Sequence, residues 1–356
     1  MKLVFIASGQ SFHACRWANT LVHKGYDIHF ISTVPFKRVL DSKINKYELK
    51  SLLGFSKYIL NVRQVRVIID KIKPDIIHAH YASGNGLLAS LSLIGLNYPL
   101  VTSLYGSEVY DFPHKSLLHK KILKWIVSSS NQVLSTSEAM ADEFLKLFPS
   151  FNRPIITPFG VDTKLFKPAC VRINDGVLEI GLVKKLEHKY GVDILIKAFS
   201  IFIKESKQRA KLTIVGGGPD EAELKKLVCD LSIQDYVNFY GWVDNSDIPN
   251  FLNSLDIFVV PSRRESFGVA AVEAMACGLP TIVSNVGGLP EVVIHGESGL
   301  IFEKEDVDEL VYLLNIVSQD QDLRKNMALK ARDRVLDYYD WQCSVEIMER
   351  TYQSLC

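Results

Sequence analysis

The sequence has no segment long enough to cross a membrane and no paired cysteines. None of its apolar runs reaches the roughly 18 residues that a transmembrane helix needs, so no such helix is expected. The six cysteines are scattered without a CxxC pair or the spacing of a metal site, which favours a reduced, cytoplasmic location. The opening run, MKLVFIASGQ, predicts a first β-strand rather than a signal peptide.

Composition and length indicate an ordinary globular chain with two domains. Hydrophobic residues make up 47% and charged residues 23%, which excludes a disordered chain. A chain of 356 residues is too long for one typical core and suits two domains of about 170 residues each.

The net charge of +1 conceals a basic first half and an acidic second half. Residues 1–170 carry 21 Lys and Arg against 11 Asp and Glu, which is +10, and the remainder carries 20 against 29, which is −9. The two halves are therefore expected to meet different partners. Nucleic acid is not favoured, because the aromatic and basic motifs of RNA-binding domains are absent. Anionic lipid or a phosphorylated acceptor fits the basic half better.

Short β-branched runs alternate with helical patterns along the whole chain. Near-continuous apolar runs such as KLVFIAS, DIIHAHY, LEIGLVK and DIFVVPS are typical of buried parallel strands. Two sets of five or six such strands predict an α/β protein with two doubly wound, Rossmann-like domains that face each other across a cleft. We expect domains over 1–168 and 169–337, a linker over 160–176, and a last helix, 338–356, that packs back on the first domain. Ligands of such sheets bind beyond the carboxyl ends of the strands.

The stretch RRESFGVAAVEAMACGLP places two carboxylates beside an otherwise apolar helix. Ser266 is the expected N-cap, so the amides of Phe267 and Gly268 would face a phosphate group. Glu265 and Glu273 would lie about 10 Å apart along the helix. That span suits a nucleotide diphosphate sugar, with one carboxylate on the sugar and the other on the ribose. The alternative is a solvated Glu265 and a Glu273 that caps neighbouring backbone.

These residues resemble the E-x7-E signature of glycosyltransferase family 4, the group 1 glycosyl transferases. The segments TPFGVDTKLFKP, LTIVGGGPDEAELKKL and GLPEVVIHGESGLIF continue the resemblance over nearly all of the C-terminal half. The resemblance implies a GT-B fold, retention at the anomeric carbon and a UDP-, GDP- or ADP-sugar donor, with no metal ion. It also implies that Glu265 contacts the transferred sugar and Glu273 the ribose.

The family places two cations about five residues apart on the donor diphosphate, and Lys184 and Lys189 have this spacing. They would neutralise the charge that develops on the leaving group. Lys185 is an alternative to Lys184, because GLVKKLEHKYG departs from the family's usual loop. A solvated run of charge is the alternative to both.

Two further stretches of the second half are expected near the donor. Gly217, in TIVGGGP, is assigned to the wall of the site, although three glycines can also form a simple turn. Trp242 and Val243 are expected to offer backbone contacts to the base.

In the first half, candidate residues follow three predicted strands. Gly9 would let a diphosphate approach the backbone, and His13 and Arg16 would contact substrate, unless they only cap or pack the helix. His78 and His80 lie on a strand whose alternation predicts that one of them faces a packed side. A core histidine is the favoured interpretation of each.

LYGSEVYDF departs from the family's His-Gly dipeptide, because Tyr105 stands before the glycine. Tyr105 or Glu108 would take the place of the missing histidine, which the family uses to contact the donor sugar. Ser137 begins a helix where relatives hold substrate, and a plain N-cap fits it equally well.

Three further segments of the sequence are rich in charge. Asp306 and Asp308 form a DxD triplet, but they open a late helix, where acidic residues favour the dipole over a metal. Segments 35–74 and 113–130 mix Lys and Arg with Leu, Ile and Trp at helical spacing. Such helices lie on anionic membranes, or they simply present a solvated face over a packed stripe.

The sequence therefore predicts a retaining glycosyltransferase of cell-surface polysaccharide or glycolipid synthesis, acting at the inner face of the membrane. It would move a hexose-type sugar to a saccharide or lipid-linked acceptor. The alternatives are a non-catalytic nucleotide-sugar or lipid-binding protein and a sugar-nucleotide epimerase.

Overall fold

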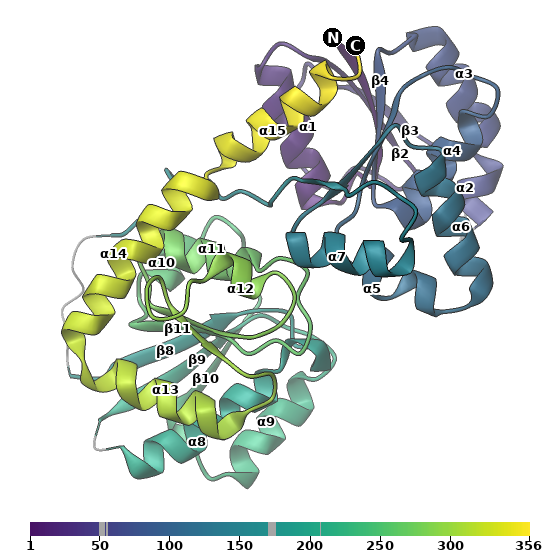
Figure 1. Ribbon diagram of the computed structural model, residues 1–356. Coiled ribbons are helices and arrows are strands. Elements are labelled where there is room, and N and C mark those ends of the chain that lie inside the picture. The colour runs from purple at the N-terminus through teal and green to yellow at the C-terminus, as the bar shows by residue number, and fades with distance from the viewer. Residues whose placement is uncertain (50–53, 55, 170–175, 207) are drawn as a thin grey trace. The chain divides into compact units, whose positions relative to one another are not determined.

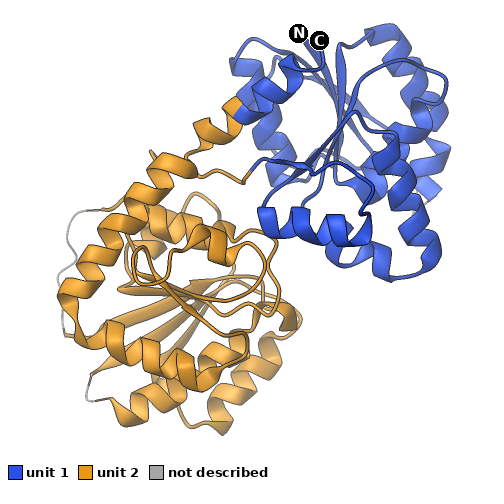
Figure 2. Ribbon diagram, viewed as in Figure 1, with its two compact units in different colours: residues 1–157, 347–356 blue, residues 158–346 orange. Residues whose placement is uncertain are grey.

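The computed structural model describes residues 1–49, 54, 56–169, 176–206 and 208–356. Parts of the expected linker (170–175) and of the basic segment 35–74 (50–53 and 55) lie outside the described residues. The chain divides into two compact units, shown in Figure 2. Unit 1 comprises residues 1–157 and 347–356, and unit 2 comprises residues 158–346.

Unit 1 contains a seven-stranded parallel sheet in the order β3-β2-β1-β4-β5-β6-β7. Its strands are β1 (Lys2–Ala7), β2 (Asp27–Ser32), β3 (Asn45–Glu48), β4 (Ile76–His80), β5 (Leu100–Ser103), β6 (Gln132–Ser135) and β7 (Ile155–Ile156). Its helices are α1 (Phe12–His23), α2 (Ser56–Leu60), α3 (Val62–Ile72), η1 (Ala82–Gly86), α4 (Leu87–Ser92), α5 (Ser107–Tyr110), η2 (Phe112–His114), α6 (Leu117–Ser128) and α7 (Glu138–Leu147).

Unit 2 contains a six-stranded parallel sheet in the order β10-β9-β8-β11-β12-β13. Its strands are β8 (Leu178–Val183), β9 (Ala210–Val215), β10 (Val237–Gly241), β11 (Ile257–Val260), β12 (Thr281–Ser284) and β13 (Leu300–Phe302). Its helices are η3 (His188–Tyr190), α8 (Val192–Glu205), α9 (Glu221–Asp230), η4 (Gln234–Tyr236), α10 (Ile248–Leu252), α11 (Val269–Ala276), α12 (Leu289–Val292), α13 (Val307–Gln319) and α14 (Gln321–Tyr338).

Apolar strands explain why both sheets are buried between layers of helices. All of β1 after Lys2 is buried, as is all of β11, so neither strand has a solvent face. In unit 2, α8, α9 and α13 cover one face of the sheet and α11, α12 and α14 the other (Figure 1). Unit 1 follows the same plan, with α1 on one face and α3 and α4 on the other (Figure 1). Both units are therefore doubly wound, as predicted.

Two edge strands and one helix boundary differ from the expectation. The strand β3 lies within segment 35–74, which was expected to be helical, and its sequence NKYE has no apolar pattern. The strand β7 has only two residues. The last helix, α15 (Trp341–Gln353), begins at Trp341, because the chain leaves helical geometry after Tyr338.

The end of α15 is part of the unit 1 core. Tyr352 is fully buried, and its hydroxyl lies 2.6 Å from Nδ1 of His78. Lys24, the residue directly after α1, forms an ion pair of 3.0 Å with Glu349. Across the described residues, every helix is too short or too polar to traverse a bilayer.

Candidate active site

The carboxyl end of the unit 2 sheet brings three loops together. The amide of Lys184, after β8, donates to Val215 of β9 at 2.9 Å, and the amide of Leu186 donates to Gly217 at 3.1 Å. On the other side, the amide of Arg263, after β11, donates to Lys189 at 2.9 Å. The loop after β8 is therefore hydrogen-bonded to the loops of both neighbouring strands.

Lys184 and Glu265 form an ion pair at the centre of these loops. Their side chains are only 14% and 11% exposed. The ammonium of Lys184 also lies 4.6 Å from the centre of the Tyr190 ring. Lys185 points elsewhere, since it pairs with Glu187 and is 58% exposed. The structure thus brings Lys184, and not Lys185, to Glu265.

Lys189 lies beside this pair on the same loop. Its ammonium is 2.9 Å from Oε2 of Glu187 and 4.9 Å from the centre of the Tyr190 ring. Burial lowers the pKa of Lys189, but the hydrogen bond and the charge of Glu187 outweigh that effect, so the pKa is raised above its usual value. Both ammonium groups therefore lie near the Tyr190 ring, an arrangement that can hold a polyanionic group.

The helix after Glu265 begins later than predicted. Gly268, with φ +114°, is the residue before α11, and no side chain caps the helix. The assignment of Ser266 as the N-cap is therefore wrong. Phe267 is buried, with its ring centre 5.6 Å from that of Tyr339. Glu273 lies on the second turn of α11 and is half-buried.

Glycines let the surrounding backbone approach Glu265 and Lys184. A Cβ on Gly287, whose φ is +52°, would lie 1.7 Å from the carbonyl oxygen of Glu265. A Cβ on Gly216 would lie 1.9 Å from the carbonyl oxygen of Lys184. The space beside Gly217 is open, since a Cβ there would have only Oε2 of Glu221 within 4 Å, at 3.8 Å. Gly287 was not among the predicted site residues. The pair of glycines after β12 was the feature of the sequence that could have indicated it.

Trp242 and Val243 follow the edge strand β10. The amide of Gly216 donates to the carbonyl of Gly241 at 2.8 Å. This bond places Trp242 and Val243 beside the loop that contains Gly216 and Gly217. Trp242 is exposed and Val243 is half-buried.

In unit 1, the loop after β1 is covered rather than open. The amide of Gly9 donates to Ser32 Oγ at 2.8 Å, and a Cβ on Gly9 would lie 2.6 Å from the ring of Phe36. His13 follows in the first turn of α1. Burial, and secondarily the charge of Arg16, lowers the pKa of His13 to about 4. His13 is therefore neutral at pH 7.

A buried chain of hydrogen bonds runs across the carboxyl end of the unit 1 sheet. His78 Nε2 lies 2.7 Å from Ser103 Oγ, and Ser103 also bonds the hydroxyl of Tyr105. The same hydroxyl lies 2.6 Å from Nδ1 of His80. Both histidines are fully buried with their rings stacked at 4.1 Å, so the prediction that only one faces a packed side is wrong. Residues two apart on a strand share a face.

Burial sets the protonation of this chain. It lowers the pKa of His78 to about 3, and it also lowers the pKa of His80 well below its usual value, with the charges of His78 and His13 adding to the effect. His78 has partners on both ring nitrogens, as a core histidine should. Nε2 of His80 is buried and has none among the described residues.

Glu108, in the short helix α5 that follows Tyr105, is completely buried. Its Oε2 accepts from the amide of Tyr105 at 3.3 Å and from the hydroxyl of Ser107 at 3.2 Å. Burial outweighs these bonds and raises the pKa of Glu108. Glu108 therefore fixes the backbone that carries Tyr105.

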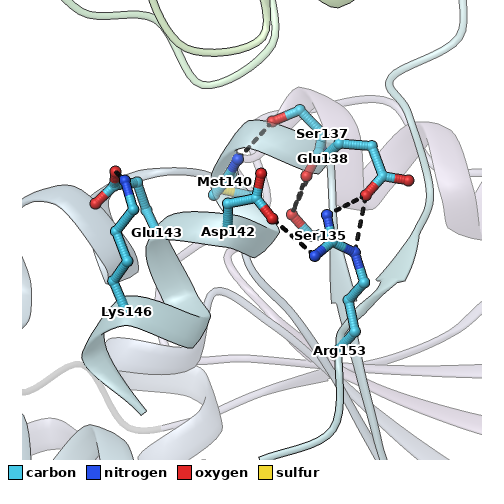
Figure 3. A network of polar contacts seen from close by, with 8 residues as sticks. All are labelled: Ser135, Ser137, Glu138, Met140, Asp142, Glu143, Lys146 and Arg153. Carbon is cyan, nitrogen blue, oxygen red and sulfur yellow. Dashed lines mark hydrogen bonds and ion pairs between the residues drawn. The ribbon is translucent and has the colours of Figure 1, made fainter. Parts of the chain in front are cut away.

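Ser137 is the N-cap of α7, as Figure 3 shows. Its Oγ accepts from the amide of Met140 at 3.1 Å, and the side chain is fully buried. Arg153 clamps the exposed side of the same helix through Glu138 and Asp142 (Figure 3). The capping interpretation of Ser137 is confirmed.

Asp306 has the same role at α13. Its Oδ1 accepts from the amide of Glu309 at 2.9 Å, so the DxD triplet opens a helix, as expected. In the ranges that the structure describes, no group of three or more His, Cys, Asp or Glu is arranged to hold a metal ion.

Comparison with known proteins identifies the chain. The family model for glycosyl transferases group 1 matches residues 166–334, and the model for glycosyl transferase 4-like proteins matches residues 2–137. The chain belongs to the group 1 glycosyltransferases. N-acetyl-alpha-D-glucosaminyl L-malate synthase of Bacillus anthracis is 29% identical to this glycosyltransferase, over 93% of this chain and 90% of that one.

Solved structures identify the fold of this glycosyltransferase as GT-B. Sucrose-phosphate synthase of Thermosynechococcus elongatus matches with a TM-score of 0.86 and 21% identity, over 100% of this chain and 99% of that one. Anabaena Alr3699/HepE, solved in complex with UDP-glucose, matches with a TM-score of 0.82 and 21% identity, also over 100% and 99%.

We predict that Gly287→Ala disrupts the site of this glycosyltransferase. The new Cβ would overlap the carbonyl of Glu265, and the positive φ adds strain, so the free energy of unfolding should fall by about 3 kcal/mol or more. Urea unfolding measures this change. Gly296→Ala is the control, since Gly296 has φ +78° but nothing within 4 Å of a Cβ, and should cost only about 1 kcal/mol. Equal costs would contradict the proposed overlap.

We also predict that stability falls as the pH drops below 6.5. The unfolded chain binds protons at its histidines near pH 6.5, whereas folded His78 does so only near pH 3, so stability is present above 6.5 and is lost on acidification. The loss should reach about 1.4 kcal/mol per pH unit for each such histidine. Urea unfolding between pH 7.5 and 5 measures the slope.

The variant His78→Gln isolates this effect, because Glu108, with its raised pKa, acts in the opposite direction in both proteins. Its slope should be shallower than that of the wild type. His114→Gln, which removes an exposed histidine, is the matched control. Identical slopes for His78→Gln and the wild type would show that His78 titrates normally.

Proposed function

We propose that this glycosyltransferase moves a hexose-type sugar, with retention, from a nucleotide diphosphate sugar to a saccharide or lipid-linked saccharide. The observation that carries the proposal is the largely buried Lys184–Glu265 pair with Lys189 beside it. HepE, which shares the fold, was solved with UDP-glucose, and the relative from Bacillus anthracis is named for an N-acetylglucosaminyl group. These names support a sugar nucleotide as the donor. We place the reaction in polysaccharide or glycolipid synthesis.

The chemistry follows from the charges at this end of the sheet. The acceptor hydroxyl forms a bond to the anomeric carbon while the bond from that carbon to the diphosphate oxygen breaks. The acceptor proton passes to the departing phosphate. Lys184 and Lys189 neutralise the charge that accumulates on this leaving group, which lowers the barrier most in a partly desolvated site. Glu265 orients the sugar and, before the donor arrives, balances Lys184.

Glu273 and the loops around it complete the proposed donor site. Glu273 is assigned to the ribose, and the backbone at Gly268 and at the more open Gly217 to the phosphates. Val243 is assigned to the base. Gly9 is assigned to the donor diphosphate, and His13, Arg16 and Tyr105 are assigned to the sugar or acceptor side, with Tyr105 in place of the family's histidine. Ser137 is buried as a cap, so its proposed contribution is through the backbone at the start of α7.

We predict that a nucleotide diphosphate sugar stabilises the wild type and that Glu265→Gln abolishes its turnover. A panel of UDP-, GDP- and ADP-sugars in a thermal-shift assay selects the donor, because a ligand stabilises the folded state by RT ln(1 + [L]/Kd), so at equal concentration the tightest binder raises the melting temperature most. Glu265→Gln should lower kcat at least about 100-fold, the usual cost of one charged group in such a site.

Glu297→Gln, at an exposed glutamate of unit 2, is the matched control and should retain full activity. Product analysis separates the alternatives, since an epimerase would release a changed sugar nucleotide without any acceptor. Activity of Glu265→Gln within threefold of the wild type would overturn the assigned role. Failure of every donor to shift melting would overturn the proposed function.

We further infer that unit 1 contacts an anionic membrane through α6. Leu117 and Leu118 are 80% and 64% exposed, and Trp125 is 37% exposed. Lys121 and Lys124 are exposed among them, and no acidic residue occurs from 112 to 137. Apolar and cationic side chains on one surface helix are what an interfacial helix presents to lipid.

The helix α2 extends this surface chemistry. It exposes Ile59 and Leu60, and, like α6, it packs against α4. Unit 1 therefore carries two short helices with exposed apolar residues on the same supporting helix. This matches a lipid-linked acceptor better than a free saccharide in water.

We predict that the protein sediments with vesicles of phosphatidylcholine and phosphatidylglycerol but not with phosphatidylcholine alone. Lys121→Gln/Lys124→Gln should reduce partitioning about 30-fold, because each lysine near an anionic surface is worth about 1 kcal/mol. Lys226→Gln/Lys330→Gln, which removes two exposed lysines of unit 2, should have no effect. Equal partitioning of the two double variants, or binding that ignores lipid charge, would contradict the inference.

A further inference from the structure

Arg263 lies two residues before Glu265, yet its guanidinium faces away from that site. Its NH1 and NH2 donate to Oδ1 and Oδ2 of Asp193, each at 2.8 Å, and its Nε donates to Oε1 of Glu305 at 2.6 Å. NH1 also donates to the carbonyl of His188 at 2.8 Å. Four of the five N–H groups of the side chain are therefore used, and the side chain is only 12% exposed. Arg263 is not available to grip a phosphate.

The contacts of Arg263 converge on the loop that carries Lys189. The amides of Arg263 and Arg264 donate to the carbonyl of Lys189 at 2.9 and 3.1 Å. The guanidinium holds the neighbouring carbonyl, that of His188. Gly191 closes the loop so tightly that a Cβ there would lie 1.9 Å from the carbonyl oxygen of Pro261. The backbone on both sides of the Lys189 side chain is thus tied to the strand end that also carries Glu265.

The two acidic partners anchor Arg263 from different elements. Asp193 lies in the first turn of α8. Burial raises the pKa of Asp193, but the hydrogen bonds and charges of Arg263 and Lys197 outweigh this effect and lower the pKa to about 2. Glu305 lies between β13 and α13 with φ +66°, a backbone conformation that a glutamate rarely adopts. Its carboxylate pairs with Nε of Arg263 at 2.6 Å.

We propose that Arg263 is a positioning residue that sets the distance between Lys189 and the Lys184–Glu265 pair, and so the fit of the donor diphosphate. It acts through the backbone of residues 188–189 and touches no ligand. The proposal rests on the proposed function, because it assigns the diphosphate to Lys184 and Lys189. Arginine is required because only a planar fork can bind both oxygens of Asp193 while reaching Glu305 and His188.

The test compares nucleoside diphosphates with monophosphates. UDP, GDP and ADP are each paired with UMP, GMP and AMP, and the dissociation constants are measured by calorimetry for the wild type and for Arg263→Lys. A lysine keeps the charge but loses the fork. Binding of the preferred diphosphate should weaken at least tenfold, while binding of its monophosphate should change less than twofold. A residue that only stabilised the fold would not discriminate between the two ligands.

Two further variants keep the test decisive if Arg263→Lys does not fold. Glu305→Gln leaves the fork to Asp193 intact and should cause a smaller loss, about threefold, that is again confined to the diphosphate. Lys197→Gln removes the other partner of Asp193, on the exposed side of α8, and should leave both ligands unaffected.

The outcomes separate the two proposals. If the wild type binds a diphosphate and Arg263→Lys binds it equally well, or loses both ligands in the same proportion, the positioning role is overturned and the proposed function stands. If the wild type binds none of the three diphosphates, the proposed function is overturned and the positioning role with it.

Discussion

The ion pair of Lys184 and Glu265 is the constraint on which the site of unit 2 depends. Each side chain is almost buried, and either charge alone would be costly to keep out of water. Pairing requires that the ends of the paired strands β8 and β11 lie close together, and Gly216 and Gly287 let the neighbouring loops, after β9 and β12, approach Lys184 and Glu265. The outcome is a site whose charges are already in place and already balanced. A phosphate or sugar that binds there replaces one partner of Lys184 or Glu265, and the side chains are already ordered before it arrives.

Much of the fold was predictable because buried parallel strands leave a simple pattern. Runs such as KLVFIA and IFVV have no polar face, so their order along the chain indicates the layers directly. The meeting of Lys184 with Glu265 was predictable for the same reason, since both follow strands of one parallel sheet. The edge strand β3, with its sequence NKYE, was not, because it is fixed by pairing with β2 and not by its own apolar residues.

The parts of the site that escaped prediction are those set by tertiary contacts. Ser266 has the chemistry of an N-cap, but Gly268, packed against Leu289, starts the helix two residues later. Arg263 looked like one more charge beside Glu265, and its partners Asp193 and Glu305 lie 70 and 42 residues away. No local pattern encodes such a meeting. The hydrogen-bonded chain of His78, Ser103 and Tyr105 could not be predicted from the sequence either. The alternation of residues along a strand shows which side chains share a face, but not which side chains of other elements they contact.

The burial of Tyr352 against His78 also orders events during synthesis. Residues 347–356 complete unit 1, although all of unit 2 precedes them in the chain. The ribosome has therefore made the whole of unit 2 before His78 can gain its hydroxyl partner. Unit 2 can fold as it emerges, whereas unit 1 must wait, with part of its core unfilled, until the final helix arrives. The unit made first is thus the last to be finished.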